Sequence, residues 1–325
     1  MSRSPELVLG VDAGGTSTRA VVVSLDGEIL ARSRGEGANP RSARNPAEAL
    51  AGALRDALAG VDPQRVAGGV FGLAGSGAAG RALAEQLAGL AWEQAGLPGR
   101  PVVVPDLAVA FAAATPLPDG ALLLSGTGAV AALLRDRQVS RRCDGYGWLV
   151  GDEGSGVWIG REAVRAALAA LDGREEPTAL VDGVSAALRC DGDAPEGLAQ
   201  RLVGAVYGAE PARLAILAPV VDAAARAGDP VARRITAEAV AGLLRSAKAL
   251  GPLDDGTPFV LAGSLLTRPT LLAEGVRAGL AELGVHRPLR ALDGAAGAAA
   301  LAARGRGAGD AAHRRLSEGQ QEAGR

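Results

Sequence analysis

The chain has 325 residues, of which 48% are hydrophobic and 22% are charged, so it is long enough for two globular domains and too apolar for a disordered protein. Thirty-four basic and 36 acidic residues leave a formal net charge of -2, which excludes the strongly basic surface typical of nucleic-acid-binding proteins. Two cysteines, Cys143 and Cys190, cannot build a disulfide framework. The sequence contains neither a signal-peptide pattern nor an unbroken apolar run of membrane-spanning length, so we expect a cytoplasmic protein with no membrane partner.

The first third of the chain has the pattern of an α/β domain that opens with a β-meander. Asn45 is the expected N-cap of the first helix. Strands are predicted at residues 6–12, 19–25, 28–32, 66–73 and 102–104, and helices at residues 46–58, 81–94 and 107–114.

The opening pattern then recurs, which indicates a second α/β domain. Strands are predicted at residues 121–125, 129–135, 139–142 and 258–262, and helices at residues 160–171, 178–189, 194–207, 211–227, 230–250, 270–283 and 293–304. We therefore predict an N-terminal domain at 1–115, completed by the helix at 293–304, a C-terminal domain at 116–292, and a frayed tail at 305–325.

Two glycine-rich turns, one at the head of each predicted domain, are candidate phosphate-binding loops. The first contains Gly14, Gly15, Thr16 and Ser17, and the second contains Gly126, Thr127 and Gly128. Adjacent glycines allow backbone N–H groups to point into one concavity that suits phosphate oxygens, and the hydroxyl groups add donors. Each turn alone is equally well explained as a tight hairpin, but the repetition favours a nucleotide bound from both sides.

Further residues extend this candidate site. Asp12 ends the first strand, where its carboxylate could bind Mg²⁺ directly or through water. Gly263 and Ser264 follow a strand and are candidates for the adenosine site, although this segment taken alone favours an ordinary strand-to-helix turn. The only lysine is Lys248, in the middle of a predicted helix, so a lysine-containing P-loop is excluded. Any bound ATP must therefore be held by backbone amides, hydroxyl groups and a metal ion.

Asp106 lies between a short buried strand and a helix. A helix N-cap explains this position well. In the functional alternative its carboxylate orients a substrate hydroxyl group and accepts the proton late in phosphoryl transfer. The two roles are compatible.

Residues 143–159 combine aromatic side chains, glycines and carboxylates in one short segment. Tyr146, Trp148 and Trp158 lie here, with Gly145 and Asp152 between them. Aromatic faces and fixed carboxylates suit a sugar, which offers apolar C–H faces and hydroxyl donors. The alternative is that the tryptophans anchor the core and that Asp152 and Glu153 cap a helix; we expect Trp158 to be core and Asp152 to be functional. Asn39 could offer its amide to a ligand, although spacing alone favours an ordinary Asn-Pro turn.

Taken in order, VDAGGTSTRAVVV, the SGTG turn, GDEGSGVWIG, LAGS and DGAAGAAALA resemble the N-acetylglucosamine kinase group of the BadF/BadG/BcrA/BcrD ATPase family. The resemblance spans most of the chain. It implies two ribonuclease-H-like domains around a nucleotide cleft, ATP and Mg²⁺ as cofactors, a small-molecule sugar substrate and a homodimer. It also implies that Asp106 is the base facing the sugar 6-hydroxyl group, and that Asn39, Gly145, Tyr146 and Asp152 bind the sugar. Tyr146 stands where the kinases often have tryptophan, and Ala129-Val130 replaces polar residues that contact the sugar.

The leading hypothesis is therefore an ATP-dependent kinase that phosphorylates the 6-hydroxyl group of N-acetylglucosamine. Glucosamine or another hexosamine is an alternative substrate, because the Ala129-Val130 change affects sugar contacts. An ATPase activator of a 2-hydroxyacyl-CoA dehydratase would need cysteines for an iron–sulfur cluster, and neither cysteine has the expected Gly-Cys context at a helix start. A non-catalytic sugar sensor is the third alternative.

Overall fold

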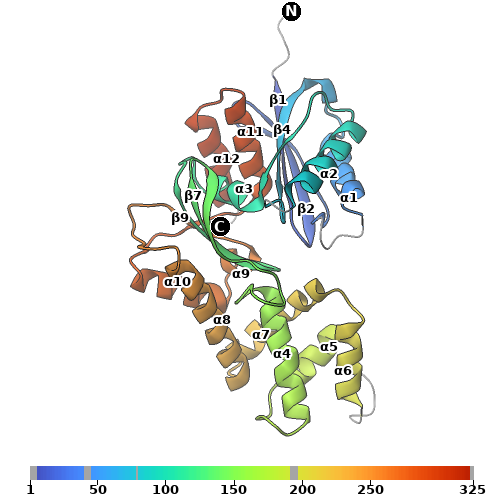
Figure 1. The fold of residues 1–325 in the computed structure, drawn as a ribbon, viewed down its shortest axis with the longest axis vertical. Coiled ribbons are helices and arrows are strands. Elements are labelled where there is room, and N and C mark those ends of the chain that lie inside the picture. Colours follow the sequence, from blue (N-terminus) through green and yellow to red (C-terminus); the bar gives the residue numbers. More distant parts are fainter. Residues whose placement is uncertain (1–5, 40–44, 78–79, 191–196, 323–325) are drawn as a thin grey trace, which may run out of the picture. The chain divides into compact units, whose positions relative to one another are not determined.

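The computed structural model describes residues 6–39, 45–77, 80–190 and 197–322. Its contacts divide the chain into two compact units. The first unit comprises Met1–Gly120, Leu134–Ser140 and Leu289–Arg325, and the second comprises Ala121–Leu133 and Arg141–Pro288. Both units contain strands and helices (Figure 1).

The first unit is built on a mixed five-stranded sheet in the order β3-β2-β1-β4-β5. Its strands are β1 (Leu7–Ala13), β2 (Ser17–Ser24), β3 (Ile29–Glu36), β4 (Val66–Leu73) and β5 (Val102–Pro105). The pairs β1–β2 and β2–β3 are antiparallel, whereas β1–β4 and β4–β5 are parallel. The carboxyl ends of β1, β4 and β5 therefore meet at one edge of the sheet, where α/β proteins bind their ligands.

Helices cover both faces of this sheet (Figure 1). On one face, α1 (Pro46–Ala57) and α2 (Arg81–Gln94) pack on alternate residues of β1 and β2. The Asn45 side chain accepts a hydrogen bond from the Glu48 N–H, so the expected N-cap is present. The short helix η1 (Pro63–Arg65) precedes β4, and α3 (Asp106–Ala112) follows β5 directly.

The opposite face is covered by α11 (Gly294–Gly305), which is made almost entirely of alanine and glycine. A Cβ atom on Gly10 would lie 2.2 Å from the Ala295 carbonyl oxygen, so a glycine in β1 and small residues in α11 allow their backbones to approach closely.

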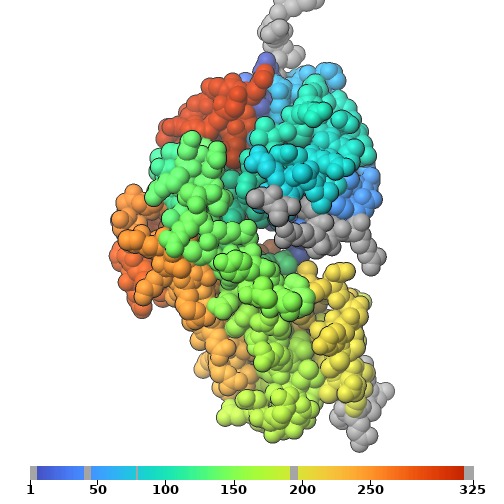
Figure 2. Space-filling model, viewed as in Figure 1, coloured from blue at the N-terminus to red at the C-terminus, as the bar shows by residue number. Residues whose placement is uncertain are grey.

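The expected frayed tail at 305–325 is wrong for most of its length. Residues Asp310–Glu322 form α12, and residues 323–325 lie outside the described part of the chain. The side chains of His313 and Leu316 are 2% exposed, and Leu316 belongs to the same hydrophobic cluster as α11. The two helices form a continuous surface (red, Figure 2). Apolar side chains spaced along a polar segment explain the helix: it buries one narrow stripe and leaves the remainder exposed.

The second sheet has the order β10-β9-β6-β7-β8. Its strands are β6 (Gly120–Ser125), β7 (Ala129–Arg135), β8 (Gln138–Asp144), β9 (Phe259–Ala262) and β10 (Leu289–Arg290). The pairing of β6 with β9 is parallel. Its helices are α4 (Gly156–Leu171), α5 (Leu180–Leu188), α6 (Leu198–Tyr207), α7 (Ala218–Arg226), α8 (Pro230–Lys248), α9 (Ser264–Thr267) and α10 (Leu271–Glu282).

The helix predicted at 211–227 is divided into a 3₁₀ helix, η2 (Pro211–Leu217), followed by α7. Pro219 explains the division, because it has no N–H group to donate to the carbonyl four residues earlier. No helix in the described part of the chain is long and apolar enough to span a membrane.

Candidate functional site

The β1–β2 hairpin of the first unit has the geometry of an anion-binding turn. Gly14 closes the turn by donating its N–H to the Ser17 carbonyl oxygen at 3.1 Å. The next two N–H groups, those of Gly15 and Thr16, donate no hydrogen bond to any described residue. Two adjacent, uncommitted N–H groups beside the Thr16 and Ser17 hydroxyls can together bind an anion.

Asn39 is held against this hairpin by the backbone. The Gly14 carbonyl oxygen accepts hydrogen bonds from the N–H groups of Ala38 and Asn39, at 3.1 and 3.2 Å. A Cβ atom on Gly37 would lie 2.3 Å from the Gly15 carbonyl oxygen, so only glycine allows this approach. The structure thus brings the predicted sugar ligand Asn39 to the predicted phosphate turn.

Asp12 lies in a group of carboxylates at the carboxyl ends of the strands. Burial raises its pKa to about 7, and the negative charge of Asp106 contributes in the same direction. Arg19, directly opposite on β2, lowers this pKa, and Asp293 raises it. The first turn of α11 closes over the carboxylate, since a Cβ atom on Gly294 would lie 2.5 Å from the Asp12 Oδ2.

Asp106 follows β5 and is the first residue of α3. Its Oδ1 accepts a hydrogen bond from the Leu107 N–H at 3.0 Å. The N-cap position is Pro105, which makes no side-chain cap hydrogen bond, so Asp106 is the first helical residue rather than the N-cap. Between Asp12 and Asp106 lies Gly72 of β4, where a Cβ atom would lie 2.2 Å from the Val109 Cγ2. Because Gly72 has no side chain, α3, which begins with Asp106, packs closely against β4, the neighbour of the strand that carries Asp12.

These carboxylates suit one hard cation. No three histidine, cysteine, aspartate or glutamate residues of the described chain come together as a metal-binding group. Mg²⁺ is typically held by one or two protein carboxylates, several waters and the phosphates of a substrate. Asp12, whose ionised form is destabilised by its acidic neighbours, fits that type of site.

In the second unit the β6–β7 hairpin repeats the pattern of the first. Gly126 donates its N–H to the Gly128 carbonyl oxygen at 2.9 Å, and the N–H groups of Thr127 and Gly128 donate to no described residue. The start of α4 is fixed to this turn, because the Gly156 N–H donates to the Gly126 carbonyl oxygen at 2.7 Å.

Gly263 and Ser264 lie beside this second turn. A Cβ atom on Gly263 would lie 2.1 Å from the Ser125 carbonyl oxygen, and the positive φ of 84° there also requires glycine. Ser264 begins α9. The predicted phosphate turn at 126–128 and the predicted adenosine segment at 263–264, which are 135 residues or more apart in the sequence, are thereby in contact.

Asp152 connects the candidate sugar loop to the same turn. Its Oδ1 accepts a hydrogen bond from the Gly147 N–H at 3.1 Å, and its Oδ2 would lie 2.9 Å from a Cβ atom on Gly128. Burial raises the pKa of Asp152, and the charge of Asp144 adds to this effect. The alternative that Asp152 and Glu153 cap the helix is wrong: the cap of α4 is Ser155, whose hydroxyl group accepts a hydrogen bond from the Trp158 N–H.

Asp144 is a residue whose role the sequence analysis missed. Its carboxylate accepts hydrogen bonds from the N–H groups of Gly145, Asp152 and Glu153 at 2.7 to 2.9 Å, and so closes the loop. An aspartate followed by glycine at the end of a strand was the available signal.

The aromatic residues of this loop have different environments. Tyr146 is 73% exposed and Trp148 is 43% exposed, whereas Trp158 packs against the core of the second unit, as expected. Val130 is buried, and a Cβ atom on Gly145 would lie 3.0 Å from its Cβ. An apolar side chain, that of Val130, therefore supports the loop at Gly145.

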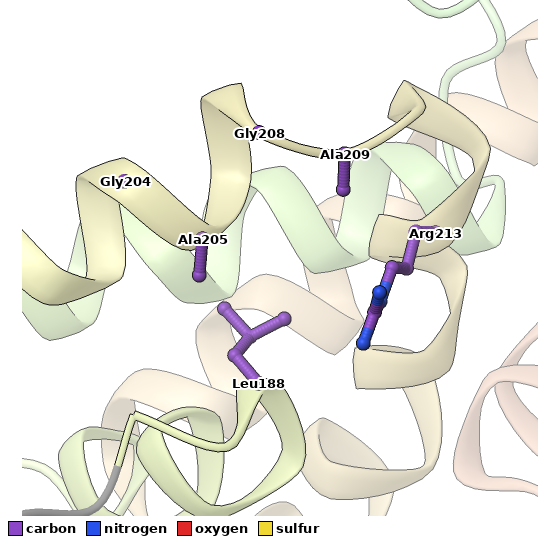
Figure 3. Close-up of a pocket in the computed structure, with 6 residues that line it drawn as sticks. All are labelled: Leu188, Gly204, Ala205, Gly208, Ala209 and Arg213. Atoms are coloured by element: carbon purple, nitrogen blue, oxygen red, sulfur yellow. The ribbon is translucent and has the colours of Figure 1, made fainter.

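A separate hollow of about 270 Å³ lies among α5, α6 and η2 (Figure 3). Its lining consists of small or aliphatic residues and the exposed Arg213. None of the predicted site residues line this hollow.

The profile of the BadF/BadG/BcrA/BcrD ATPase family matches residues 9–302. An N-acetylmuramic acid/N-acetylglucosamine kinase from Clostridium acetobutylicum is 34% identical over 157 residues, which are 48% of this chain and 49% of that protein. The match thus spans about half the length of this curated relative.

Solved structures agree with the fold. A Chromobacterium violaceum protein proposed to be an N-acetylglucosamine kinase is 29% identical, with a TM-score of 0.72 over 91% of this chain and 99% of that one. A ROK-family glucokinase from Streptomyces griseus, in complex with glucose and AMPPNP, has a TM-score of 0.55 at 23% identity over 92% and 99% of the two chains; this likeness concerns the fold alone. The expected α/β fold of actin-like sugar kinases is confirmed.

Proposed function

The chain belongs to the BadF/BadG/BcrA/BcrD ATPase family, and we propose that it is an ATP-dependent kinase that phosphorylates the 6-hydroxyl group of N-acetylglucosamine or a closely related amino sugar. The observation that carries this proposal is the repeated turn. Each hairpin presents two consecutive N–H groups without a partner among the described residues, next to a threonine hydroxyl group.

In this proposal both hairpins bind the same triphosphate. Gly14, Gly15, Thr16 and Ser17 act from the first unit, and Gly126, Thr127 and Gly128 act from the second. Gly263 and Ser264, which contact the second turn, bind the adenosine part. Backbone donors are preorganised, so they stabilise charge in the transition state without a cost of reorganisation.

Asp12 would hold Mg²⁺, directly or through water. Bound Mg²⁺ neutralises negative charge on the phosphate oxygens. The proximity of Asp106 and Asp293, which disfavours ionised Asp12, also means that a cation is especially favourable there.

Asp106 is the proposed base. Its place at the carboxyl end of β5 suits a carboxylate that orients the 6-hydroxyl group and accepts its proton. Phosphoryl transfer has a loose transition state, so positioning the hydroxyl matters more than strong basicity. Asn39, Gly145, Tyr146 and Asp152 would bind the remaining sugar groups.

The identity of the sugar is the finer part of the proposal. The Clostridium relative acts on N-acetylmuramic acid and N-acetylglucosamine, which supports an N-acetylated hexosamine. Buried Val130 supplies no hydrogen bond beside Gly145, so glucosamine or another hexosamine is the alternative substrate. The homodimer and the cytoplasmic location stay predictions.

The dehydratase-activator alternative is disfavoured by the cysteines. Cys190 is buried and its Sγ lies 3.7 Å from the carbonyl oxygens of Leu188 and Arg201, which is the environment of a structural thiol. Cys143 lies in β8, away from any helix start. Residues 191–196, which follow Cys190, lie outside the described chain.

The test is sugar-stimulated ADP release with N-acetylglucosamine, N-acetylmuramic acid, glucosamine and glucose side by side. We expect turnover with an N-acetylated hexosamine and a product phosphorylated at the 6-position, identified by NMR. Asp106→Asn should lower kcat by about 10²-fold or more while nucleotide binding is retained. Absence of turnover with every sugar would favour the sensor alternative, and full activity of Asp106→Asn would remove Asp106 from its proposed role.

A further inference from the structure

Three arginines share one face of the first unit's sheet, and one of them, Arg19, lies directly opposite Asp12. Arg19 of β2 lies directly opposite Arg34 of β3, and Arg32 lies opposite Val21 in the next row. Val21 packs in the hydrophobic cluster that contains α11, so all three arginines lie on the α11 side of the sheet.

These arginines line a hollow of about 390 Å³. Asp293, the N-cap of α11, is the one acidic residue of its lining, and it forms a salt bridge with Arg32. Arg19 interacts electrostatically with Asp12 but forms no salt bridge with a described residue. Arg34 forms neither a hydrogen bond nor a salt bridge with any residue that the structure describes.

Like charges directly opposite each other on neighbouring strands destabilise a sheet. An anion between the guanidinium groups would remove this repulsion. Guanidinium groups bind phosphate oxygens in pairs of hydrogen bonds, which makes arginine the preferred residue for phosphate recognition. Residues opposite each other on paired strands, such as Arg19 and Arg34, are about 5 Å apart, and diagonal neighbours, such as Arg19 and Arg32, are about 7–8 Å apart. The three guanidinium groups therefore cover more than the width of a single phosphate.

We propose that this hollow, here called the arginine groove, binds an oligophosphate of two or three phosphate groups. Arg19 and Arg34 bind one phosphate between them, and Arg32 contributes to the next. The groove lies on the face of the sheet, whereas the uncommitted N–H groups of Gly15 and Thr16 lie at the tip of the hairpin. In this proposal it is a second anion site, which lies next to Asp12 but does not use the N–H groups of the hairpin tip.

The test is calorimetric titration at low ionic strength with inorganic phosphate, pyrophosphate and tripolyphosphate. Each is added to the wild type and to Arg34→Ala, with and without saturating Mg·AMPPNP. We expect tripolyphosphate to bind more tightly than phosphate, and Arg34→Ala to weaken its binding by about tenfold or more. Binding should persist with AMPPNP present and weaken with added salt. Arg100→Ala, at another exposed arginine of the first unit, is the matched control and should bind as the wild type does.

Equal tripolyphosphate affinity of the wild type and Arg34→Ala would overturn the proposal, as would complete displacement by AMPPNP. A second equivalent of AMPPNP that binds in an Arg34-dependent manner would identify a nucleotide, rather than a free oligophosphate, as the source of the phosphates. Sugar-stimulated turnover of Arg34→Ala should equal that of the wild type. Arg34-dependent binding in a protein without turnover would leave this inference standing while removing the kinase proposal.

Discussion

At Asp12 the fold maintains a carboxylate in surroundings that oppose its ionisation. It is half-buried, it faces the charges of Asp106 and Asp293, and only Arg19 offsets them. Such an arrangement costs stability in the absence of a cation, and strained electrostatics of this kind are typical of binding sites rather than of structural ion pairs.

This cost has a definite pH dependence. Because the folded-state pKa of Asp12 is raised to about 7 from an ordinary value near 4, the folded state binds more protons than the unfolded state between these values. Stability from this group is therefore highest below about pH 4 and falls as the pH rises to about 7. Asp12→Asn should abolish this loss of stability and raise the free energy of unfolding at pH 8 by as much as about 4 kcal/mol relative to the wild type.

The measurement is chemical unfolding at pH 4.5 and pH 8 in the presence of a chelator. Asp26→Asn is the control, since Asp26 is exposed in the β2–β3 turn. The increase in the free energy of unfolding should occur with Asp12→Asn and not with Asp26→Asn, and it should be larger at pH 8 than at pH 4.5. A gain that is equal at the two pH values would show that Asp12 is ionised normally.

Among the elements, α12 contacts the C-terminal end of α3, the helix that begins with the proposed base. The Nε2 of His313 lies 2.7 Å from the Ala112 carbonyl oxygen at the end of α3, while its Nδ1 is buried without a partner among the described residues. Burial lowers the pKa of His313, and the charges of Arg304 and Arg137 act in the same direction. The neutral imidazole, with its proton on Nε2, therefore fits this environment.

His313 should accordingly make the protein sensitive to mild acid. A lowered pKa in the folded state means that the unfolded state binds the proton first, so stability is lost as the pH falls below about 6.5. His313→Gln retains an N–H donor for Ala112 but cannot be protonated. We expect it to lower the unfolding free energy at pH 8 by about 1 kcal/mol and to lose less stability than the wild type between pH 7 and pH 5.

Thermal unfolding at these pH values tests this expectation, with His286→Gln as the control because the chain's other histidine is exposed. If His313→Gln and the wild type lose stability in parallel below pH 6.5, the acid sensitivity arises elsewhere. Each variant must be compared with the wild type at the same pH, because Asp12 lowers stability as the pH rises to about 7, whereas His313 lowers it as the pH falls below about 6.5.

For the whole molecule, the sequence predicted the fold where local signals and packing agree. The strands β1, β4 and β6 are apolar runs that are followed within two residues by glycine. The helix α8 has an Asp229 cap followed by proline, and the predicted bounds of all four elements are nearly correct. The elements that were missed are short or depend on tertiary contacts. α9 has four residues, β10 has two, and α12 is polar apart from its buried stripe.

The candidate site was predictable where its residues are glycines or strand-end carboxylates. Contacts between distant segments were not predictable: Gly294 closing over Asp12, and Asp144 accepting three N–H groups, depend on packing that no local pattern encodes. The arginine groove was missed for the same reason, because the opposition of Arg19 and Arg34 depends on the register of β2 with β3.

The repeated hairpin makes a prediction about the molecule as a whole. If both turns bind one triphosphate, removing either threonine hydroxyl should weaken binding of the same ligand. Thr16→Ala and Thr127→Ala should each weaken Mg·AMPPNP binding by about 1 kcal/mol, or about fivefold. Ser246→Ala, which removes a hydroxyl group from α8, should leave the affinity unchanged.

The double variant then distinguishes one shared ligand from two independent anion sites. With one ligand, calorimetry should show a single binding event whose affinity reflects both substitutions, and any departure from additivity measures the coupling of the two turns through the bound phosphates. With independent sites, each substitution would weaken a separate event and leave the other unchanged. Because the N–H donors of both turns belong to the backbone, binding should be weakened but retained in the double variant; complete loss would mean that the hydroxyl groups, rather than the backbone, carry phosphate recognition.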